Sequence, residues 1–355
     1  MMVRNPFLLL AVLLLCAGLA AQPLSGNYTI PGNYKTFTAA AAALQSNGVS
    51  GPVTFVVVPG TYNESFTLPY VQGASATNTI TVRSIVPGLV KLKGTSGPTV
   101  TFAKGSSSQQ VAWYVLDGLE FTSGPDNAIL GNQYNYDIEI KNCTFLANHG
   151  TGQSASRKRL VYLNGSRIER WDIHHNEFTL IPGPSARAMY FSQIRDCKFH
   201  HNLVHLNGCY YGFYMINTNN SRNHYYNNIF EGKLYASSSS VVMYIGASQY
   251  DVNLSHNTFY VDTGSSGARI IYGRGCCTTR RVWVYSNIFY NLGSGPCLDW
   301  YTGSSYLQNY YRGDGNLFFR PGSTPVVVGR VGSTTYNLAG WQAATSSQDQ
   351  KSKVG

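Results

Sequence analysis

An eight-residue pattern that returns along the chain constrains the fold more than any other feature. It runs apolar, any, apolar, any, any, Asn, any, apolar, and its first full copy spans residues 171–178. Later copies end at Val204, Phe230, Phe259, Phe289 and Phe318, so the pattern returns every 26 to 30 residues. Two earlier copies, ending at Phe121 and Phe145, lack the asparagine. The full copies carry it at Asn176, Asn202, Asn228, Asn257, Asn287 and Asn316.

A repeat of this length with alternating apolar positions predicts an all-β solenoid. Each repeat supplies a short strand, a one-residue bend and a second strand. When repeats stack as parallel strands, equivalent residues lie about 4.8 Å apart. Asparagine suits the bend because it tolerates the left-handed backbone conformation. Its amide can also hydrogen-bond to the amides above and below. We therefore predict a ladder of asparagines along the solenoid axis.

This pattern resembles the right-handed parallel β-helix of the pectin-lyase-like superfamily, whose members carry an asparagine ladder in one of their turns. The resemblance covers roughly residues 53–330 and implies a right-handed parallel β-helix, to which the chain's own residues add a short N-terminal capping helix. It implies no single activity, because the superfamily contains lyases, hydrolases, esterases, tailspikes and adhesins. The catalytic sets of pectate lyases, polygalacturonases and pectin methylesterases have no match in this chain. We therefore assign no reaction and leave open whether the protein is an enzyme.

The sequence divides into four parts. Residues 1–21 are typical of a secretory signal peptide, so we expect a secreted or cell-surface protein without a transmembrane segment. Residues 22–52 predict an N-terminal cap whose helix, residues 36–47, begins at Thr36 or Thr38 and ends at Gly48. The β-helix follows at residues 53–330. Residues 331–355 lack the repeat and predict an irregular, frayed tail.

A second repeated pattern, apolar-Tyr-apolar, lies between the asparagines. If the flanking apolar residues point inward, the aromatic residues point outward as a stacked column. Tyrosine offers flat faces and hydroxyls to sugars, and arginine pairs with uronate carboxylates or sulfates. The alternative is that tyrosine serves only strand propensity and self-stacking. The predicted substrate-binding residues are Tyr162, Tyr190, Tyr214, Tyr244, Tyr272 and the less regular Trp300, with Arg159, Arg187 and Arg269 three positions before three of the tyrosines. We call this set the tyrosine–arginine stripe.

Histidines gather on the strand that enters the asparagine and in the bend, where His175, His201 and His256 stand. Stacked imidazoles repel when charged, which lowers their pKa values, and a neutral base suits β-elimination from a uronate. The catalytic candidates are His174, His200, Tyr226 and Lys198. The alternative is that these are tolerated turn and surface residues. Because carboxylates are few here, we predict no metal site, and we expect no cofactor.

Charge and cysteine content limit the partners and the redox chemistry. The formal net charge of +10 favours an anionic partner, which we take to be an acidic polysaccharide rather than nucleic acid. Removal of the signal peptide leaves Cys143, Cys197, Cys209, Cys276, Cys277 and Cys297, whose pairing the sequence leaves open. We expect Cys143 and Cys197 to be buried thiols. The oligomeric state is also open.

Two hypotheses about function follow. The first is a secreted β-helix that binds an acidic, uronate-containing polysaccharide on the tyrosine–arginine stripe and, if it is an enzyme, cleaves it as a lyase or hydrolase. The second is a non-catalytic surface, adhesion or structural module in which the stripe only stabilises the fold.

Overall fold

The computed structural model describes residues 22–122, 126–147, 159–216, 220–246, 249–262, 267–274, 281–301, 304–322 and 325–355. The predicted signal peptide, Cys276 and Cys277 lie outside these residues. Within them, no helix has the length and apolar content needed to cross a bilayer.

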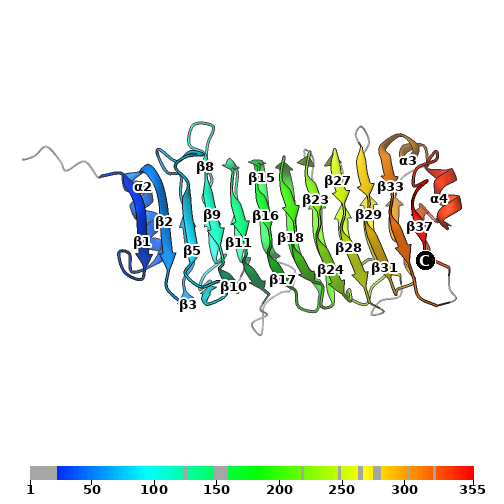
Figure 1. Ribbon diagram of the computed structural model, residues 1–355, viewed down its shortest axis with the longest axis horizontal. Helices are drawn as coiled ribbons and strands as arrows, with labels where there is room; N and C mark the ends of the chain where they lie inside the picture. Colours follow the sequence, from blue (N-terminus) through cyan, green and yellow to red (C-terminus); the bar gives the residue numbers. More distant parts are fainter. Residues whose placement is uncertain are drawn as a thin grey trace, which may run out of the picture.

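The chain winds into a rod of about nine turns with three long parallel sheets along its sides. In Figure 1 the N-terminal coils lie at one end of the rod and the C-terminal helices at the other. We name the sheets A, B and C in the order in which the chain visits them. The predicted parallel β-helix is therefore confirmed.

Sheet A carries the strands that enter the asparagine bend. Its 11 strands, in spatial order, are β1 (Leu24–Ile30), β2 (Val49–Val57), β5 (Ile80–Ser84), β9 (Tyr114–Asp117), β13 (Glu139–Lys141), β16 (Asp172–His174), β19 (Lys198–His200), β23 (His224–Tyr226), β27 (Val252–Ser255), β30 (Val282–Tyr285) and β33 (Tyr311–Asp314).

Sheet B carries the strands that leave the bend. Its 11 strands are β3 (Gly60–Asn63), β6 (Val90–Lys93), β10 (Glu120–Thr122), β14 (Thr144–Leu146), β17 (Glu177–Thr179), β20 (Leu203–His205), β24 (Ile229–Gly232), β28 (Thr258–Val261), β31 (Ile288–Asn291), β34 (Leu317–Phe319) and β37 (Lys353–Val354).

Sheet C closes each coil and holds the predicted aromatic column. Its main strands are β4 (Phe66–Leu68), β7 (Val100–Phe102), β11 (Ile129–Gly131), β15 (Arg159–Glu169), β18 (Gly183–Arg195), β21 (Cys209–Ile216), β25 (Val241–Ile245), β29 (Arg269–Arg274), β32 (Leu298–Tyr301), β35 (Gly329–Val331) and β36 (Thr334–Tyr336). Short strands extend it at β8 (Val111–Ala112), β12 (Asn135–Tyr136), β22 (Asn220–Ser221) and β26 (Gln249–Tyr250).

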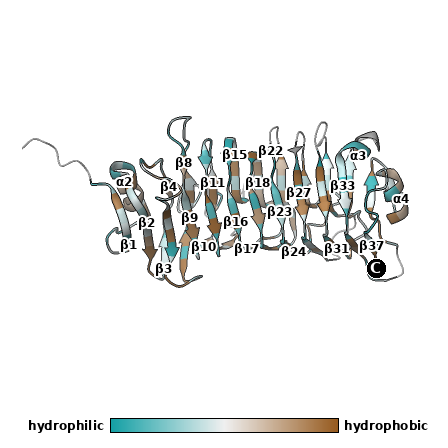
Figure 2. Cartoon of the chain, turned by 45° about the horizontal axis from the view of Figure 1, so that its top comes forward, coloured by the Kyte–Doolittle hydropathy of each residue, from teal (hydrophilic) through white to brown (hydrophobic). Residues whose placement is uncertain are grey.

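Alternate residues of each strand fill the core, as the sequence pattern requires. Figure 2 shows hydrophilic and hydrophobic segments alternating along the strands. Equivalent core residues stack on one another: the Phe145 and Phe178 rings lie 4.6 Å apart, and the Phe289 and Phe318 rings 5.0 Å apart. Because these stacks continue from coil to coil, one hydrophobic core runs the length of the rod.

The asparagine ladder lies at the bend between sheets A and B. Asn202 Nδ2 donates to Asn228 Oδ1 at 3.0 Å and to the Ile173 carbonyl at 2.9 Å, and the ladder asparagines repeat this pattern from coil to coil. All these side chains are buried. One detail of the prediction was wrong: the left-handed residue precedes the asparagine, as at His175 (φ 54°) and His201 (φ 53°). Asparagine is therefore selected for its amide rather than for its backbone.

The N-terminal end is closed by α2 (Phe37–Asn47), close to the predicted residues 36–47. Thr36 begins the helix by accepting from the Ala39 N–H at 3.1 Å, and Gly48 ends it with φ 68°. Phe37 and Leu44 face the first coil and are buried. The preceding strand β1 already pairs with β2, so sheet A begins before residue 53.

The C-terminal end is more ordered than the predicted irregular tail. After α3 (Ser304–Tyr310), residues 331–355 form β36, α4 (Leu338–Ala344) and β37, and β37 pairs with β34. Trp341 of α4 is fully buried against the last coil. These residues form a C-terminal cap, because an uncovered last coil would expose core and strand edges.

Candidate functional site

The predicted tyrosine column exists as one row of side chains on the outer face of sheet C. Strand register aligns Tyr162, Tyr190, Tyr214, Tyr244 and Tyr272 in successive coils. Their neighbours in sequence, such as Val161 and Leu163, are fully buried, whereas the tyrosines are partly exposed. The alternation therefore points the tyrosines outward, and their role in binding stays a prediction.

The tyrosine rings contact one another along the rod. Successive ring centroids lie 4.9, 5.4, 4.6 and 5.4 Å apart, with Tyr214 and Tyr244 stacked and the other pairs tilted or edge-on. Such contacts stabilise the pairs beyond the burial of apolar area. The column is thus continuous and partly exposed.

Two guanidinium groups lie against this column without a compensating carboxylate. Arg159 Cζ is 4.1 Å from the Tyr162 ring centroid, and Arg187 Cζ is 4.4 Å from the Tyr214 ring centroid. Neither arginine forms an ion pair within the described part of the chain, and the buried Nε of each has no hydrogen-bond partner there. Burial, and then the charge of Arg159, lowers the pKa of Arg187. Two like charges on adjacent strands therefore attract an anion.

The stripe ends differently from the prediction. Register places Asp299, not Trp300, beneath Tyr272, and the Trp300 side chain is 2% exposed, so Trp300 cannot bind a ligand on this face. Asp299 accepts both hydrogen bonds of Arg330, at 2.9 and 2.6 Å, and lies 3.2 Å from Arg269 Nε. Because Asp299 balances its charge, Arg269 is a weaker candidate for anion binding than Arg159 or Arg187.

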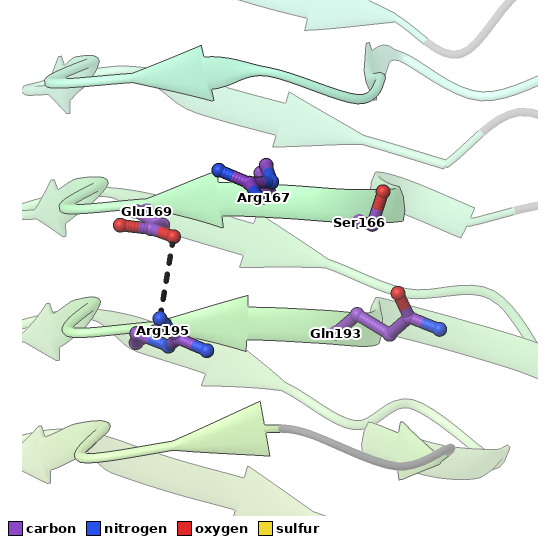
Figure 3. A pocket seen from close by; sticks show the side chains of 5 residues that line it. All are labelled: Ser166, Arg167, Glu169, Gln193 and Arg195. Atoms are coloured by element: carbon purple, nitrogen blue, oxygen red, sulfur yellow. Dashed lines mark ion pairs between the residues drawn. The ribbon is translucent and has the colours of Figure 1, made fainter. Parts of the chain in front are cut away.

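A polar hollow of about 270 Å³ opens on β15 and β18, beyond the tyrosines along the same strands. Figure 3 shows that Ser166, Arg167 and Glu169 come from one strand and Gln193 and Arg195 from the next. Glu169 lies 3.7 Å from Arg195 Nη1 across the hollow. Left-handed backbones at Arg167 (φ 60°) and Gln193 (φ 61°) shape this part of sheet C. None of the predicted site residues lines this hollow.

The catalytic candidates lie on sheet A, away from the stripe. His174, His200 and Tyr226 form one outward column, with parallel rings 4.8 and 4.6 Å apart, and Lys198 lies in the neighbouring column. His174 Nε2 is 3.0 Å from Glu139 Oε1, and His200 Nε2 is 2.9 Å from Asp172 Oδ1. Burial lowers the pKa of His200, although Asp172 opposes the shift. The structure therefore does not combine these bases with the arginines of sheet C in one site.

A groove on sheet B contains charged residues that were not among the predicted site residues. His205 Nε2 lies 3.0 Å from Glu177 Oε1, and its Nδ1 lies 2.8 Å from Glu231 Oε1. Tyr260 and Asp262 also line the groove, which measures about 610 Å³. The signal was present, because His205 and Glu231 follow the core residue of successive repeats and register aligns them.

Comparison with known proteins identifies the fold. No family model and no curated protein sequence matches the chain. An alginate lyase from Paenibacillus sp. str. FPU-7 superposes with a TM-score of 0.50 at 11% identity, covering 84% of this chain and 97% of the lyase chain. The A-module of a mannuronan C-5 epimerase from Azotobacter vinelandii gives 0.42 at 13% identity, covering 90% and 92%. A pectin methylesterase from Aspergillus niger gives 0.37 at 11% identity, covering 94% and 92%. At 11% identity the likeness to the alginate lyase is one of fold alone.

Proposed function

We propose that this parallel β-helix is exported and binds an acidic polysaccharide along the tyrosine–arginine stripe of sheet C. The single observation that carries the proposal is the pair Arg159 and Arg187, which lie on the tyrosine rings without a carboxylate partner in the described residues. Uncompensated guanidinium groups beside aromatic faces suit a ligand that is both flat-sided and anionic. A uronate or a sulfated sugar has both properties.

The geometry also suits a polymer. The tyrosine column follows the rod axis through five successive coils, so one chain of sugars can contact several of them in sequence. Arg159 and Arg187 are on adjacent strands, where they can pair with carboxylates of neighbouring sugars. The basic character of the whole chain adds a weaker, long-range attraction.

Binding, rather than a reaction, is the function that this geometry supports. The predicted bases His174, His200, Tyr226 and Lys198 lie on sheet A, whereas the tyrosines and arginines of the stripe lie on sheet C. The proposal therefore assigns a ligand class and leaves the reaction unassigned.

Affinity electrophoresis in gels that contain alginate, pectate or a glycosaminoglycan tests the proposal. The wild-type protein should be retarded by at least one acidic polymer and by no neutral glucan. Arg187→Gln should weaken the binding about tenfold, because a charge-assisted, bidentate contact is lost. Ultraviolet absorbance of the protein mixed with each polymer in solution reports whether unsaturated chain ends form.

A matched control separates a specific site from general basicity. Arg83, on β5 of sheet A, is an exposed arginine, and Arg83→Gln removes the same charge from another face. If Arg83→Gln weakens binding as much as Arg187→Gln, the stripe is not the site. If no acidic polymer retards the wild-type protein, the alternative of a structural or adhesion module is favoured.

A further inference from the structure

A cluster of imidazoles at the bend between sheets A and B has no role in the proposed polysaccharide site. His174 ends β16 and His200 ends β19, and His175 and His201 follow them at the bend, so the four rings form two rows of two. The His174 and His200 rings are parallel at 4.8 Å, as are the His175 and His201 rings. Ligand nitrogens of His175, His200 and His201 all lie within 4.8 Å of one another.

The inner histidines are oriented by carboxylates from the preceding coil. An ionised carboxylate only accepts, so the His200 nitrogen that faces Asp172 Oδ1 at 2.9 Å, Nε2, carries the hydrogen. The lone pair of His200 is therefore on Nδ1, which points at His201 Nδ1 at 2.8 Å. Glu139 and His174 repeat this arrangement one coil earlier, with His174 Nδ1 2.8 Å from His175 Nδ1. A carboxylate that orients an imidazole in this way is the usual outer shell of a metal-bound histidine.

The outer histidines can supply further lone pairs without losing a proton. His201 Nε2 lies 3.2 Å from the Asn227 side-chain amide. Rotation of that amide by half a turn would present its oxygen to Nε2–H and leave the Nδ1 lone pair free. The backbone does not require imidazole in this column, since Asn142 and Asn227 occupy the same left-handed bend in neighbouring coils. His175 and His201 are also exposed, so an ion can reach them.

We propose that His175, His200 and His201 bind one divalent late first-row transition metal ion, of the class of Zn²⁺ and Cu²⁺, with Asp172 as the positioning residue of His200. Imidazole nitrogen favours these ions over Ca²⁺ and Mg²⁺, which take oxygen ligands. With zinc–nitrogen bonds of about 2.1 Å, tetrahedral ligands lie roughly 3.4 Å apart. To bind one ion, the Nδ1 atoms of His200 and His201 must therefore move apart from 2.8 Å, and the ligand nitrogen of His175 must move closer to them. A fourth position remains open to solvent.

The site is independent of the tyrosine–arginine stripe, because it lies at another edge of the rod and uses none of its residues. A bound ion here would give the protein a Lewis-acidic or redox-active centre beside the asparagine ladder. The sequence predicted no metal site because few carboxylates accompany these histidines. In the structure the carboxylates orient the inner histidines, and imidazole nitrogens rather than carboxylates would be the protein ligands of the ion.

Isothermal titration of tag-free, chelator-treated protein with ZnCl₂ tests the proposal. The wild-type protein should bind one equivalent, and His201→Asn and His175→Asn should each weaken binding at least tenfold. Asparagine is the residue that neighbouring coils carry at this position, so these variants keep the bend. Asp172→Asn should weaken binding tenfold or more while all three ligands remain. His256→Asn is the matched control, since His256 has the same backbone (φ 55°) outside the cluster, and it should change nothing.

Cu²⁺ loading followed by electron paramagnetic resonance provides a second readout. Nitrogen hyperfine structure from three imidazoles is expected in the wild-type protein, and its loss is expected in His200→Tyr, which copies Tyr226 in the next coil. Absence of saturable Zn²⁺ binding would overturn the proposal. Equal losses in His201→Asn and His256→Asn would overturn it too, because they would indicate adventitious binding to surface histidines.

Discussion

Asn316 Nδ2 donates to Asp349 Oδ1 at 2.8 Å, so a buried carboxylate from the C-terminal cap terminates the asparagine ladder. The same oxygen accepts from Ser352 Oγ at 2.6 Å, and Oδ2 accepts from Tyr311 Oη at 2.7 Å and Trp341 Nε1 at 3.0 Å. Asp349 is fully buried. One side chain therefore joins the last coil, α4 and Ser352, the residue before β37.

Replacement of Asp349 should destabilise the C-terminal end. In Asp349→Asn an amide N–H replaces one of the two acceptor oxygens. This N–H then faces another donor, either the Trp341 N–H or the Asn316 amide N–H. A buried donor without an acceptor costs roughly 1–3 kcal/mol in the free energy of unfolding. Urea denaturation followed by tryptophan fluorescence measures the change. Asp314→Asn is the control, because Asp314 is partly exposed and water can replace its contacts, so its effect should be smaller.

Truncation within the ladder should cost more than truncation beside it. Asn228 Nδ2 donates to the Phe199 carbonyl and to Asn257 Oδ1, and Asn228 Oδ1 accepts from Asn202. Asn228→Ala leaves these groups buried and unpaired, so we expect a loss of roughly 2–4 kcal/mol in the free energy of unfolding.

Asn227→Gly is the neighbouring control for this prediction. Asn227 is outside the ladder and has φ 54°, a conformation that glycine adopts without strain. Thermal and urea unfolding of both variants should rank Asn228→Ala as clearly the less stable. Equal stabilities would contradict a stabilising role for the ladder.

The described cysteines should be inert in the folded protein. Cys143, Cys197, Cys209 and Cys297 are buried free thiols, as expected for the first two. Burial raises the pKa values of Cys143, Cys197 and Cys297 to about 12, so these thiols stay protonated at neutral pH and the reactive thiolate is scarce. Iodoacetamide at pH 8 followed by peptide mass spectrometry should leave them unmodified. The same treatment in denaturant should label them, and labelling of native Cys143 would contradict the burial.

Arg187→Lys should show whether charge or planar pairing dominates in the polysaccharide site. Lysine keeps the positive charge but loses the bidentate fork and the flat contact with the Tyr214 ring. We expect binding to acidic polymers to fall several-fold, between that of the wild type and Arg187→Gln. Measurement at two salt concentrations checks the electrostatic part, since salt should weaken all three proteins. A lysine variant that binds as tightly as the wild type would show that charge alone suffices.

The strand register and the ladder could be predicted because the repeat determines them. Residues such as Asn202 and Asn228 occupy the same place in copies of nearly equal length, so stacking follows from periodicity. The prediction failed where the repeat changes: the segment between β29 and β32 places Asp299 beneath Tyr272, and Trp300 turns inward. The C-terminal cap was missed because it lies beyond the repeat and is formed by contacts such as that between Trp341 and Asp349.

The sequence by itself determined the fold, the aromatic column and the ladder, because each depends on spacing along the chain. Only the tertiary structure decided which side chains meet between coils. It paired Asp172 with His200 and Glu177 with His205, each 28 residues apart, and left Arg159 and Arg187 without carboxylates in the described chain. The physical reason is that register aligns backbones, whereas rotamers and charge partners are selected by packing across neighbouring coils.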